Sequence, residues 1–319
     1  MSAHLLGDRK TGTALPNREA MIRIPGGSFR MGSNDFYREE RPVRGETVQG
    51  FWIDPYPVTN ADFRKFVSAT GYVTTCERPP DPAIYPDADP SLLVPGSSVF
   101  RKPRGPVDLR DNRAWWEYVP GADWRHPQGP GSNIEGRDDH PVVHVTYEDA
   151  CAYAAWAGKE LPVESEWEFA ARGGLDGATY AWGEASAPHG RAMANTWQGR
   201  FPWENLKLDG YEGTSPVDAF PANGYGLYDM IGNVWDWTAS RFTPHGGEIS
   251  GKSCCVPSAP GGARTARRVV KGGSHLCAPN YCLRYRPAAR QAEAVDTSTC
   301  HIGFRCVVRT SENRVALPA

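Results

Sequence analysis

The stretch that decides the fold is HPVVHVTYEDACAYAAWAGKELPVESEWEFAARGG, which occupies residues 140–174. Its β-branched segment VVHV, residues 142–145, predicts a strand. Thr146 then caps a helix, and Asp149 three positions later completes a capping-box pattern in which Asp replaces the usual Glu. Gly158 ends this helix, because glycine adopts the left-handed conformation that closes a helix at little cost.

Two further helices are predicted from the same kinds of signal. In ESEWEFAARGG, Ser165 is the expected N-cap and Gly173 is the expected end. Nearer the N-terminus, either Thr59 or Asn60 caps a helix that closes at Gly71. The stretch thus predicts short helices that are separated by turns.

The rest of the chain is rich in turns and aromatic residues, with 34 Gly, 28 Pro and 11 Trp. Gly and Pro interrupt regular elements, so strands are expected to be short. The strongest strand signals lie in residues 21–33, 47–59, 223–240, 268–277 and 301–310, whereas residues 76–138 predict a long structured loop region. We expect one loop-rich α+β domain over residues 20–310, a disordered extension at 1–19 and a tail at 311–319.

Charge and hydropathy exclude several classes of function. Lys+Arg 35 against Asp+Glu 37 gives a formal net charge of −2, so neither a nucleic acid nor an anionic membrane is an expected partner. The chain has no run of 18 apolar residues, and its start does not have the pattern of a secretory signal. These features predict a cytoplasmic protein, in which the eight cysteines are not expected to form a disulfide framework.

The cysteines are the strongest chemical signal, because common phosphate-loop, dinucleotide, zinc-protease and nucleophile-elbow motifs are absent. Cys277 and Cys282 flank a turn in GGSHLCAPNYCLRYRPAAR, residues 272–290. Three interpretations stay open from the spacing alone: two buried thiols, a labile disulfide, or a Cu(I) site, because two thiolates are soft ligands. Cys254 and Cys255 are adjacent, which is a poor arrangement for chelation, and no second cysteine pair completes a zinc site.

A family resemblance favours the metal interpretation. The segment GGSHLCAPNYCLRYRPAAR, followed by CHIGFRC, resembles the C-terminal signature of the formylglycine-generating enzymes, which activate sulfatases. Further matching stretches, in the family's order, include IPGGSFRMGS, YPVTNADFRKFVSATGY, TSPVDAFPANGYGLYDMIGNVWDWT and VVKGGSHLC. The resemblance covers residues 20–310 and implies a C-type-lectin-like fold. It also implies an oxidase that uses O₂ to convert the cysteine of a Cys-x-Pro-x-Arg segment of a sulfatase to Cα-formylglycine.

The same resemblance implies roles for individual residues. Cys277 and Cys282 match the family's Cu(I) ligands, and Ser274 and Tyr281 match its active-site serine and tyrosine. Residues that match positions near the substrate or the O₂ pocket are Arg290, Ser298 and Ser97, with Arg286 left as a packing or surface charge. Trp235 and Trp237 are expected either to form a wall of the cleft or to belong to the core.

Structural Ca²⁺ is a second implied cofactor, and oxygen-rich turns suit this hard cation. One matching ligand set consists of Asn195, Thr196, Asp209 and Tyr211. A second set consists of Ile231, Gly232, Asn233, Val234 and Asp236. The alternative is that these are ordinary turn residues.

The chain departs from secreted relatives at their disulfides. Pro287 replaces one half-cystine, and Ala170 or Ala171 lies at the position of its partner. A bridge between Cys151 and Cys306 stays open, although a reducing cytosol argues against it. Two other functions also stay open: a non-catalytic binding member of the superfamily, and an iron-dependent sulfoxide synthase, which requires a site of three histidines.

Overall fold

The computed structural model describes residues 20–244 and 266–310. Within these ranges lie three α-helices, α1 (Asn60–Thr70), α2 (Tyr147–Trp156) and α3 (Glu164–Arg172). Short 3₁₀ turns join them, of which η1 (Arg38–Glu40) and η2 (Thr75–Glu77) matter for the site. The predicted extension at 1–19, the tail at 311–319 and the pair Cys254–Cys255 lie outside the described residues.

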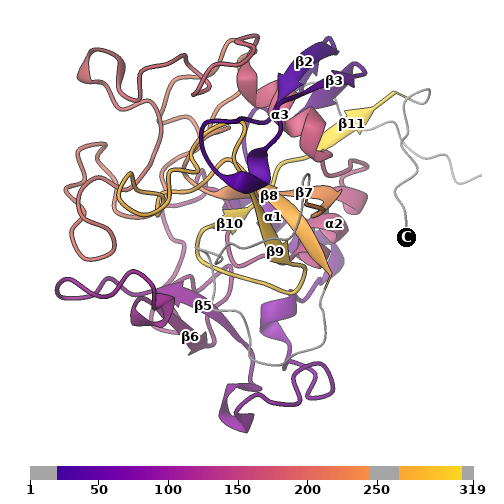
Figure 1. The fold of residues 1–319 in the computed structure, drawn as a ribbon. Coiled ribbons are helices and arrows are strands. Elements are labelled where there is room, and N and C mark those ends of the chain that lie inside the picture. Colours follow the sequence, from indigo (N-terminus) through magenta and orange to yellow (C-terminus); the bar gives the residue numbers. More distant parts are fainter. Residues whose placement is uncertain (1–19, 245–265, 311–319) are drawn as a thin grey trace, which may run out of the picture.

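The strands are short and form four small sheets (Figure 1). One three-stranded antiparallel sheet has the order β1 (Ile22–Ile24), β4 (Phe51–Ile53), β11 (Val307–Arg309). The central sheet has the order β10 (Ile302–Gly303), β7 (Trp235–Arg241), β8 (Arg267–Lys271), β9 (Arg290–Ala294), and β10 runs parallel to β7. Two pairs complete the set: β2 (Gly27–Met31) with β3 (Arg44–Val48), and β5 (Gly96–Phe100) with β6 (Trp116–Pro120).

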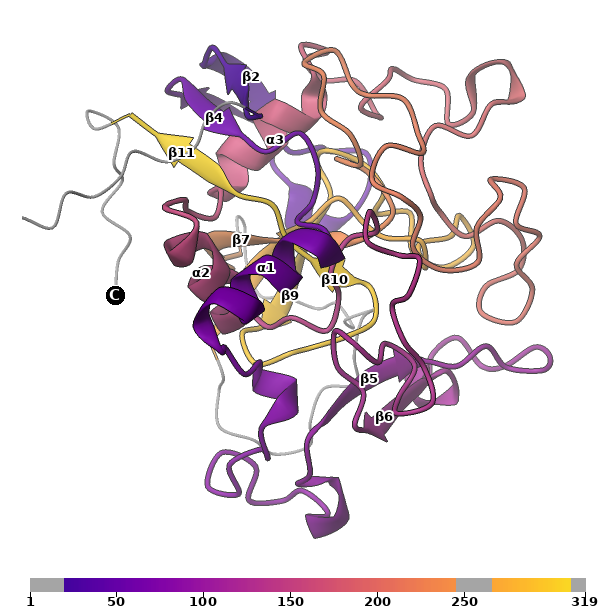
Figure 2. The same ribbon diagram turned by 180° about the vertical axis from the view of Figure 1, so that it is seen from behind.

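The expected α+β domain with few helices and many loops is confirmed. Helices α1 and α2 lie on one side of the central sheet, as Figure 2 shows, and α3 lies beside β2 and β3. Long connections without helices or strands lie beside the central sheet, at the left in Figure 1 and at the right in Figure 2. No helix among the described residues is long and apolar enough to cross a membrane.

The capping predictions for α1 and α2 are confirmed. Thr59 accepts a hydrogen bond from Asp62 N, and Gly71 closes α1 at φ 67°. Asp149 Oδ2 accepts from the Thr146 backbone N–H at 2.8 Å, which completes the predicted capping box of α2. The same carboxylate accepts from Thr75 N at 3.0 Å, so this cap also attaches η2 to the helix.

Two local predictions are wrong. Residues 142–145 form no strand, because His144 has a left-handed backbone with φ 60°. The preceding Pro141 forms an isolated antiparallel bridge with Thr59. Helix α3 starts at Glu164 and not after Ser165: Ser240 Oγ, from β7, accepts the Glu164 N–H at 2.9 Å. The N-cap is therefore Val163, whose N–H donates to Glu166 Oε2 at 2.8 Å, and the distant Ser240 adds a second hydrogen bond at this helix start. The helix ends at Gly173, φ 57°, as predicted.

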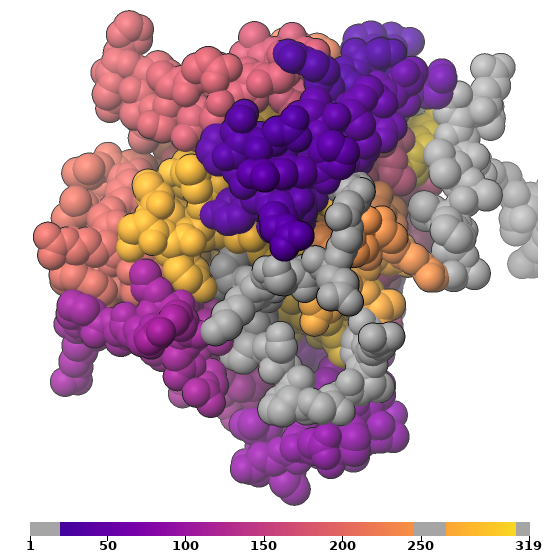
Figure 3. All heavy atoms as spheres, in the orientation of Figure 1, coloured from indigo at the N-terminus to yellow at the C-terminus, as the bar shows by residue number. Residues whose placement is uncertain are grey.

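A space-filling view shows where the C-terminal cysteine segment lies. In Figure 3 the gold residues of this segment reach the surface between the indigo N-terminal segment and the pink loops near residue 200. An aromatic cluster packs below it and contains Trp115, Trp116, Trp197 and Phe201 with Leu276. The cysteine turn is thus held on an aromatic base rather than within a sheet.

Candidate functional site

Cys277 and Cys282 form the centre of the site. Each is only 2% exposed, and their Sγ atoms are 3.4 Å apart. A disulfide bond is about 2.05 Å long, so these are two unbridged thiols in contact. Backbone hydrogen bonds from Cys277 N to Ser274 O (2.9 Å) and from Cys282 N to Ala278 O (2.8 Å) set the turn that brings them together.

A small pocket opens over the two thiols. Its walls come from five separate segments of the chain: Trp116, Phe201, Trp235, residues 274–282 and His301. The structure thus brings Ser274, Tyr281 and Trp235 to the cysteines, as the resemblance implies. Trp237 instead belongs to the core, where its indole N–H donates to Val145 O at 3.0 Å.

Sequence reasoning missed Trp116, Phe201, Leu276 and His301. The first two belong to a run of aromatic packing in which Tyr281 stacks on Phe201 at 4.7 Å between ring centroids, with the planes 8° apart. Trp115 meets the same tyrosine edge-on at 5.5 Å. The adjacent tryptophans at 115 and 116, inside a long polar loop, were the signal available in the sequence.

The pocket carries hydrogen-bond donors that have no acceptor. The buried indole N–H groups of Trp116 and Trp235 have no partner among the described residues. The Ser274 side chain is fully buried, and its Oγ accepts from Leu276 N at 3.2 Å. Because a hydroxyl that accepts still carries a hydrogen, Ser274 can donate to an oxygen atom in the pocket.

Ser97 and Ser298 meet although they are 201 positions apart. Their hydroxyl oxygens are 2.8 Å from one another, and Ser97 Oγ also lies 2.8 Å from Ser298 O. Ser97, at 1% exposure, lies behind Ser298, which is only half-buried. Direct contact between Ser97 and a substrate is therefore not what its burial favours.

Arg290 has a different environment from the one its predicted role requires. The guanidinium is buried and pairs with Glu164 through Nε–Oε1 at 2.7 Å and Nη2–Oε2 at 2.8 Å. Its Nη1 donates to Glu39 O and Thr243 O. Substrate contact by Arg290 stays a prediction that this geometry does not favour, because the guanidinium is buried and four of its five N–H donors are already used.

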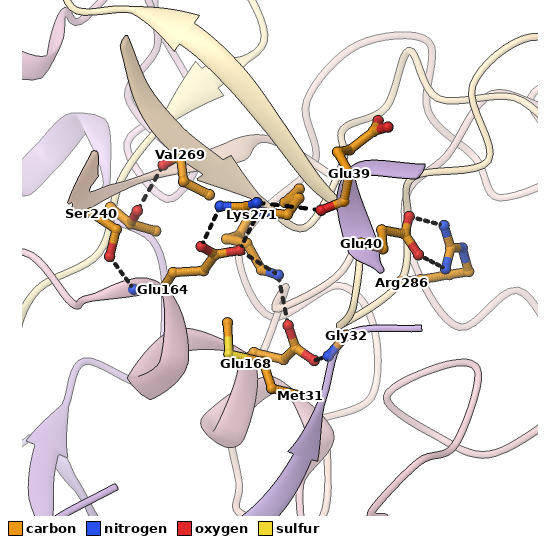
Figure 4. A network of polar contacts seen from close by, with 12 residues as sticks. Met31, Gly32, Glu39, Glu40, Glu164, Glu168, Ser240, Val269, Lys271 and Arg286 are labelled. Carbon is orange, nitrogen blue, oxygen red and sulfur yellow. Dashed lines mark hydrogen bonds and ion pairs between the residues drawn. The ribbon is translucent and has the colours of Figure 1, made fainter. Parts of the chain in front are cut away.

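Figure 4 shows the ion network behind the site. Fully buried Lys271 lies between two carboxylates, 2.9 Å from Glu168 and 3.7 Å from Glu164. Arg286 forms a two-pronged pair with Glu40 of η1, at 2.9 and 2.5 Å. The open choice for Arg286 is thereby settled: it is a buried packing charge that ties the chain after Cys282 to η1.

The first predicted calcium set is brought together. Asp209 Oδ2 lies 3.3 Å from Thr196 N and its Oδ1 lies 3.0 Å from Tyr211 N, and Asn195 Nδ2 donates to Gly213 O nearby. Burial raises the pKa of Asp209, as expected for a carboxylate gathered into a turn without a counter-ion. This oxygen-rich turn fits a hard cation.

The second calcium set fits less well. Ile231, Gly232, Asn233 and Val234 form a buried turn beside the first set, with Asn233 N donating to Asn195 O at 2.9 Å. Asp236 is used elsewhere, because its Oδ2 accepts from Arg305 Nε at 2.7 Å and from Trp167 Nε1 at 2.9 Å. A buried guanidinium already pairs with this carboxylate, but its Oδ1 is buried and has no hydrogen-bond partner among the described residues, so Asp236 offers at most one oxygen to Ca²⁺.

The other described cysteines are free thiols in separate places. Cys151 and Cys306 are not bridged, and burial raises the pKa of both thiols. Among the described residues, no group of three His, Cys, Asp or Glu side chains is placed to hold a metal ion. The three-histidine iron site of the alternative function is therefore not present in residues 20–244 and 266–310.

Comparisons with known proteins identify the family of the chain. The model of the sulfatase-modifying factor enzyme 1-like domain matches residues 9–310. A formylglycine-generating enzyme from Mycobacterium tuberculosis is 58% identical over 290 residues, covering 90% of this chain and 97% of the relative. An inactive C-alpha-formylglycine-generating enzyme 2 from Mus musculus is 41% identical over 293 residues, covering 90% and 85%.

A solved structure supports the fold. PvdO from Pseudomonas aeruginosa superposes with a TM-score of 0.59 at 25% identity, over 91% of this chain and 94% of that protein. The sequence, the fold and the buried thiol pair lead to one conclusion: the chain belongs to the sulfatase-modifying factor enzyme 1-like family and is an enzyme of the formylglycine-generating type.

Proposed function

We propose that this enzyme converts the cysteine of a Cys-x-Pro-x-Arg segment in a target sulfatase to Cα-formylglycine, with O₂ as the oxidant. The observation that carries the proposal is the pair of unbridged thiols, 3.4 Å apart, at the base of an aromatic pocket. The reaction removes two electrons from the target cysteine, breaks its Cβ–S bond and releases the sulfur as hydrogen sulfide, whereas full reduction of O₂ takes four electrons. One oxygen atom ends in the aldehyde and the other in water. A reductant, such as a small thiol, therefore supplies the other two.

Cu(I) is the proposed cofactor, held by Cys277 and Cys282. Two soft anionic sulfurs suit this ion, and the two Sγ atoms, 3.4 Å apart, lie close enough for both to bind one ion. When bound, Cu(I) would supply a redox-active centre with coordination positions open to the target thiolate and to O₂. The protein contributes a water-poor pocket in which hydrogen bonds and charges act strongly.

The pocket residues have separate proposed roles. Ser274 and the indole N–H groups of Trp116 and Trp235 donate hydrogen bonds to oxygen as it gains negative charge. Tyr281 holds its ring between Phe201 and Trp115, which fixes its hydroxyl relative to the thiols. We further propose that the Asn195–Asp209 turn binds a structural Ca²⁺ that fixes the loop carrying Phe201.

The proposed target is an extended segment. Side chains from five parts of the chain wall the pocket, so a cysteine buried in a folded domain does not reach the thiols. The described cysteines that lie outside the pocket are unbridged, which suits a reducing compartment such as the cytoplasm.

The test is the loss of turnover in Cys277→Ser and Cys282→Ser. A neutral hydroxyl does not replace a thiolate for Cu(I), so each variant should lose aldehyde formation on a Cys-x-Pro-x-Arg peptide supplied with Cu(I), O₂ and a thiol. Mass spectrometry reports the product, and Cys151→Ser, a half-buried thiol of α2, is the matched control that should stay active. Full activity in either pocket variant would refute the site.

A further inference from the structure

Arg284 lies beside one of the two pocket thiols. Its guanidinium Nη1 donates to Cys282 Sγ at 3.9 Å, a long hydrogen bond to an acceptor that is larger than oxygen. Arginine stays charged at every physiological pH. Because the residue is only 8% exposed, water screens little of this charge from the sulfur. Arg284 therefore places a permanent positive charge next to one of the proposed metal ligands.

Two residues near the N-terminus hold the guanidinium in this place. The Tyr37 ring lies against it, with 3.8 Å between Arg284 Cζ and the ring centroid, and Glu39 Oε1 accepts from Nη2 at 2.5 Å. Tyr37 is held in turn, because its hydroxyl accepts from Leu283 N at 2.9 Å. The ring and the carboxylate together keep Nη1 beside Cys282, so the position of the charge does not depend on the sulfur.

The charge balance around the site favours an anion at the thiols. Two thiolates with one Cu(I) have a net negative charge, and a buried charge is costly unless a charge of opposite sign compensates it. The ion network behind the site, shown in part in Figure 4, has a surplus of one positive charge when all its members are ionised. Its members are the carboxylates Glu39, Glu40, Glu164 and Glu168 and the cations Arg172, Lys271, Arg284, Arg286 and Arg290. Arg284 is the member that brings this surplus to a sulfur atom.

We propose that Arg284 is a positioning residue whose hydrogen bond to Cys282 Sγ stabilises the anionic two-sulfur arrangement of the site and thereby strengthens its binding of Cu(I). The inference rests on the proposed function and adds a residue behind the two ligands. Hydrogen bonds and charges behind a metal ligand tune the affinity and the reduction potential of the metal. The competing explanation is purely structural: Arg284 would only tie the cysteine turn to η1 through its pair with Glu39.

Variants of Arg284 and Glu39 separate the two explanations, with Cu(I) affinity measured anaerobically by competition with a coloured Cu(I) chelator. Arg284→Met should weaken Cu(I) binding about tenfold, because a charge-assisted hydrogen bond to the ligand is lost. Arg284→Lys keeps the charge and should lose less. Glu39→Gln removes the carboxylate that opposes Arg284 but keeps an oxygen acceptor for Nη2, so it should bind Cu(I) at least as tightly as the wild-type protein. Were Arg284 only a structural tie, Glu39→Gln would weaken binding as Arg284→Met does.

Two controls complete the experiment. Thr238→Val, which removes a buried hydrogen bond from the Thr238 hydroxyl to Val269 O, should lower Tm but leave the Cu(I) affinity unchanged. The Tm of each variant without metal reports folding, and should Arg284→Met fail to fold, the direction of the Glu39→Gln effect decides alone. A wild-type protein that binds no Cu(I) would refute the proposed cofactor and this inference with it. Tight binding by the wild-type protein with equal affinity in Arg284→Met, or weaker binding in Glu39→Gln, would overturn this inference alone.

Discussion

Replacing Arg286 with Met should strongly destabilise the fold, because it leaves a buried carboxylate unpaired. Arg286 and Glu40 are 1% and 0% exposed, and the guanidinium also donates to Leu283 O at 2.8 Å. Removing one partner of a buried pair costs about 3–5 kcal/mol. For a domain of this size, each kcal/mol lowers Tm by about 2–4 °C, so thermal unfolding should shift down by roughly 6–20 °C.

The pH dependence of that loss gives a sharper test. Burial raises the pKa of Glu40, and Arg286 is the main group that opposes this rise. Without Arg286 the pKa rises further, and a raised folded-state pKa means stability that is lost as pH increases through it. The Tm deficit of Arg286→Met should therefore be larger at pH 8 than at pH 5.5, and Glu40→Gln in the same chain should recover part of it.

An exposed pair supplies the matched control for this prediction. Arg110, whose side chain is 84% exposed, pairs with Asp108 at 2.8 Å. Arg110→Met should change Tm very little, because surface pairs contribute about 0–1 kcal/mol. A similar Tm for the two arginine variants, or a deficit for Arg286→Met that grows toward acid pH, would refute the reasoning.

Three further predictions concern calcium, a buried carboxyl and the target. Asp209→Asn should lower the Tm measured in the presence of Ca²⁺. EDTA should lower the Tm of the wild-type protein but change that of the variant very little. An equal EDTA effect on the two proteins would count against the Asn195–Asp209 site. Burial raises the pKa of Glu293 to about 7, so the contribution of this carboxyl group to stability falls as the pH rises from about 4 to 7. Glu293→Gln should therefore raise Tm at pH 8 but not at pH 5. The same change in Tm at both pH values would contradict this sign. A free Cys-x-Pro-x-Arg peptide should be oxidised much faster than the same segment within a folded sulfatase, and equal initial rates would rule out recognition of an extended chain.

The elements that the sequence predicted correctly depend on neighbours in sequence. Thr59 and Gly71 bound α1, and Thr146 with Asp149 starts α2, because each cap is satisfied within one helical turn. At the start of α3 the local signal is Glu166, whose Oε2 accepts from Val163 N, whereas Ser240, which accepts from Glu164 N, lies 76 positions away and could not be predicted from neighbouring residues. The expected strand at 142–145 failed because His144 adopts φ 60°, which composition does not reveal.

In the candidate site, too, the residues that lie close together in sequence could be predicted and those from distant segments could not. The thiols, Ser274 and Tyr281 lie within nine residues of sequence, so one motif and its family resemblance identified them together. Trp116, Phe201 and His301 reach the same pocket from distant segments, and spacing carries no information about them. The burial of Arg290 was equally hidden, because it depends on Glu164, 126 positions earlier.

The buried charges explain how a site made of loops keeps its geometry. Between β8 and β9, residues 272–289 contain neither helix nor strand, so no backbone ladder fixes the cysteines. Side chains take that role at both ends of the segment: Lys271 is held by Glu168, and Arg286 by Glu40. At Gly273, φ 72°, a Cβ would lie 2.9 Å from Tyr285 N, so the segment folds back on itself where only glycine fits. Each ion pair requires its partner at a fixed distance, whereas apolar contacts tolerate sliding. The proposed binding of one metal ion by both sulfurs requires the fixed geometry that ion pairs provide.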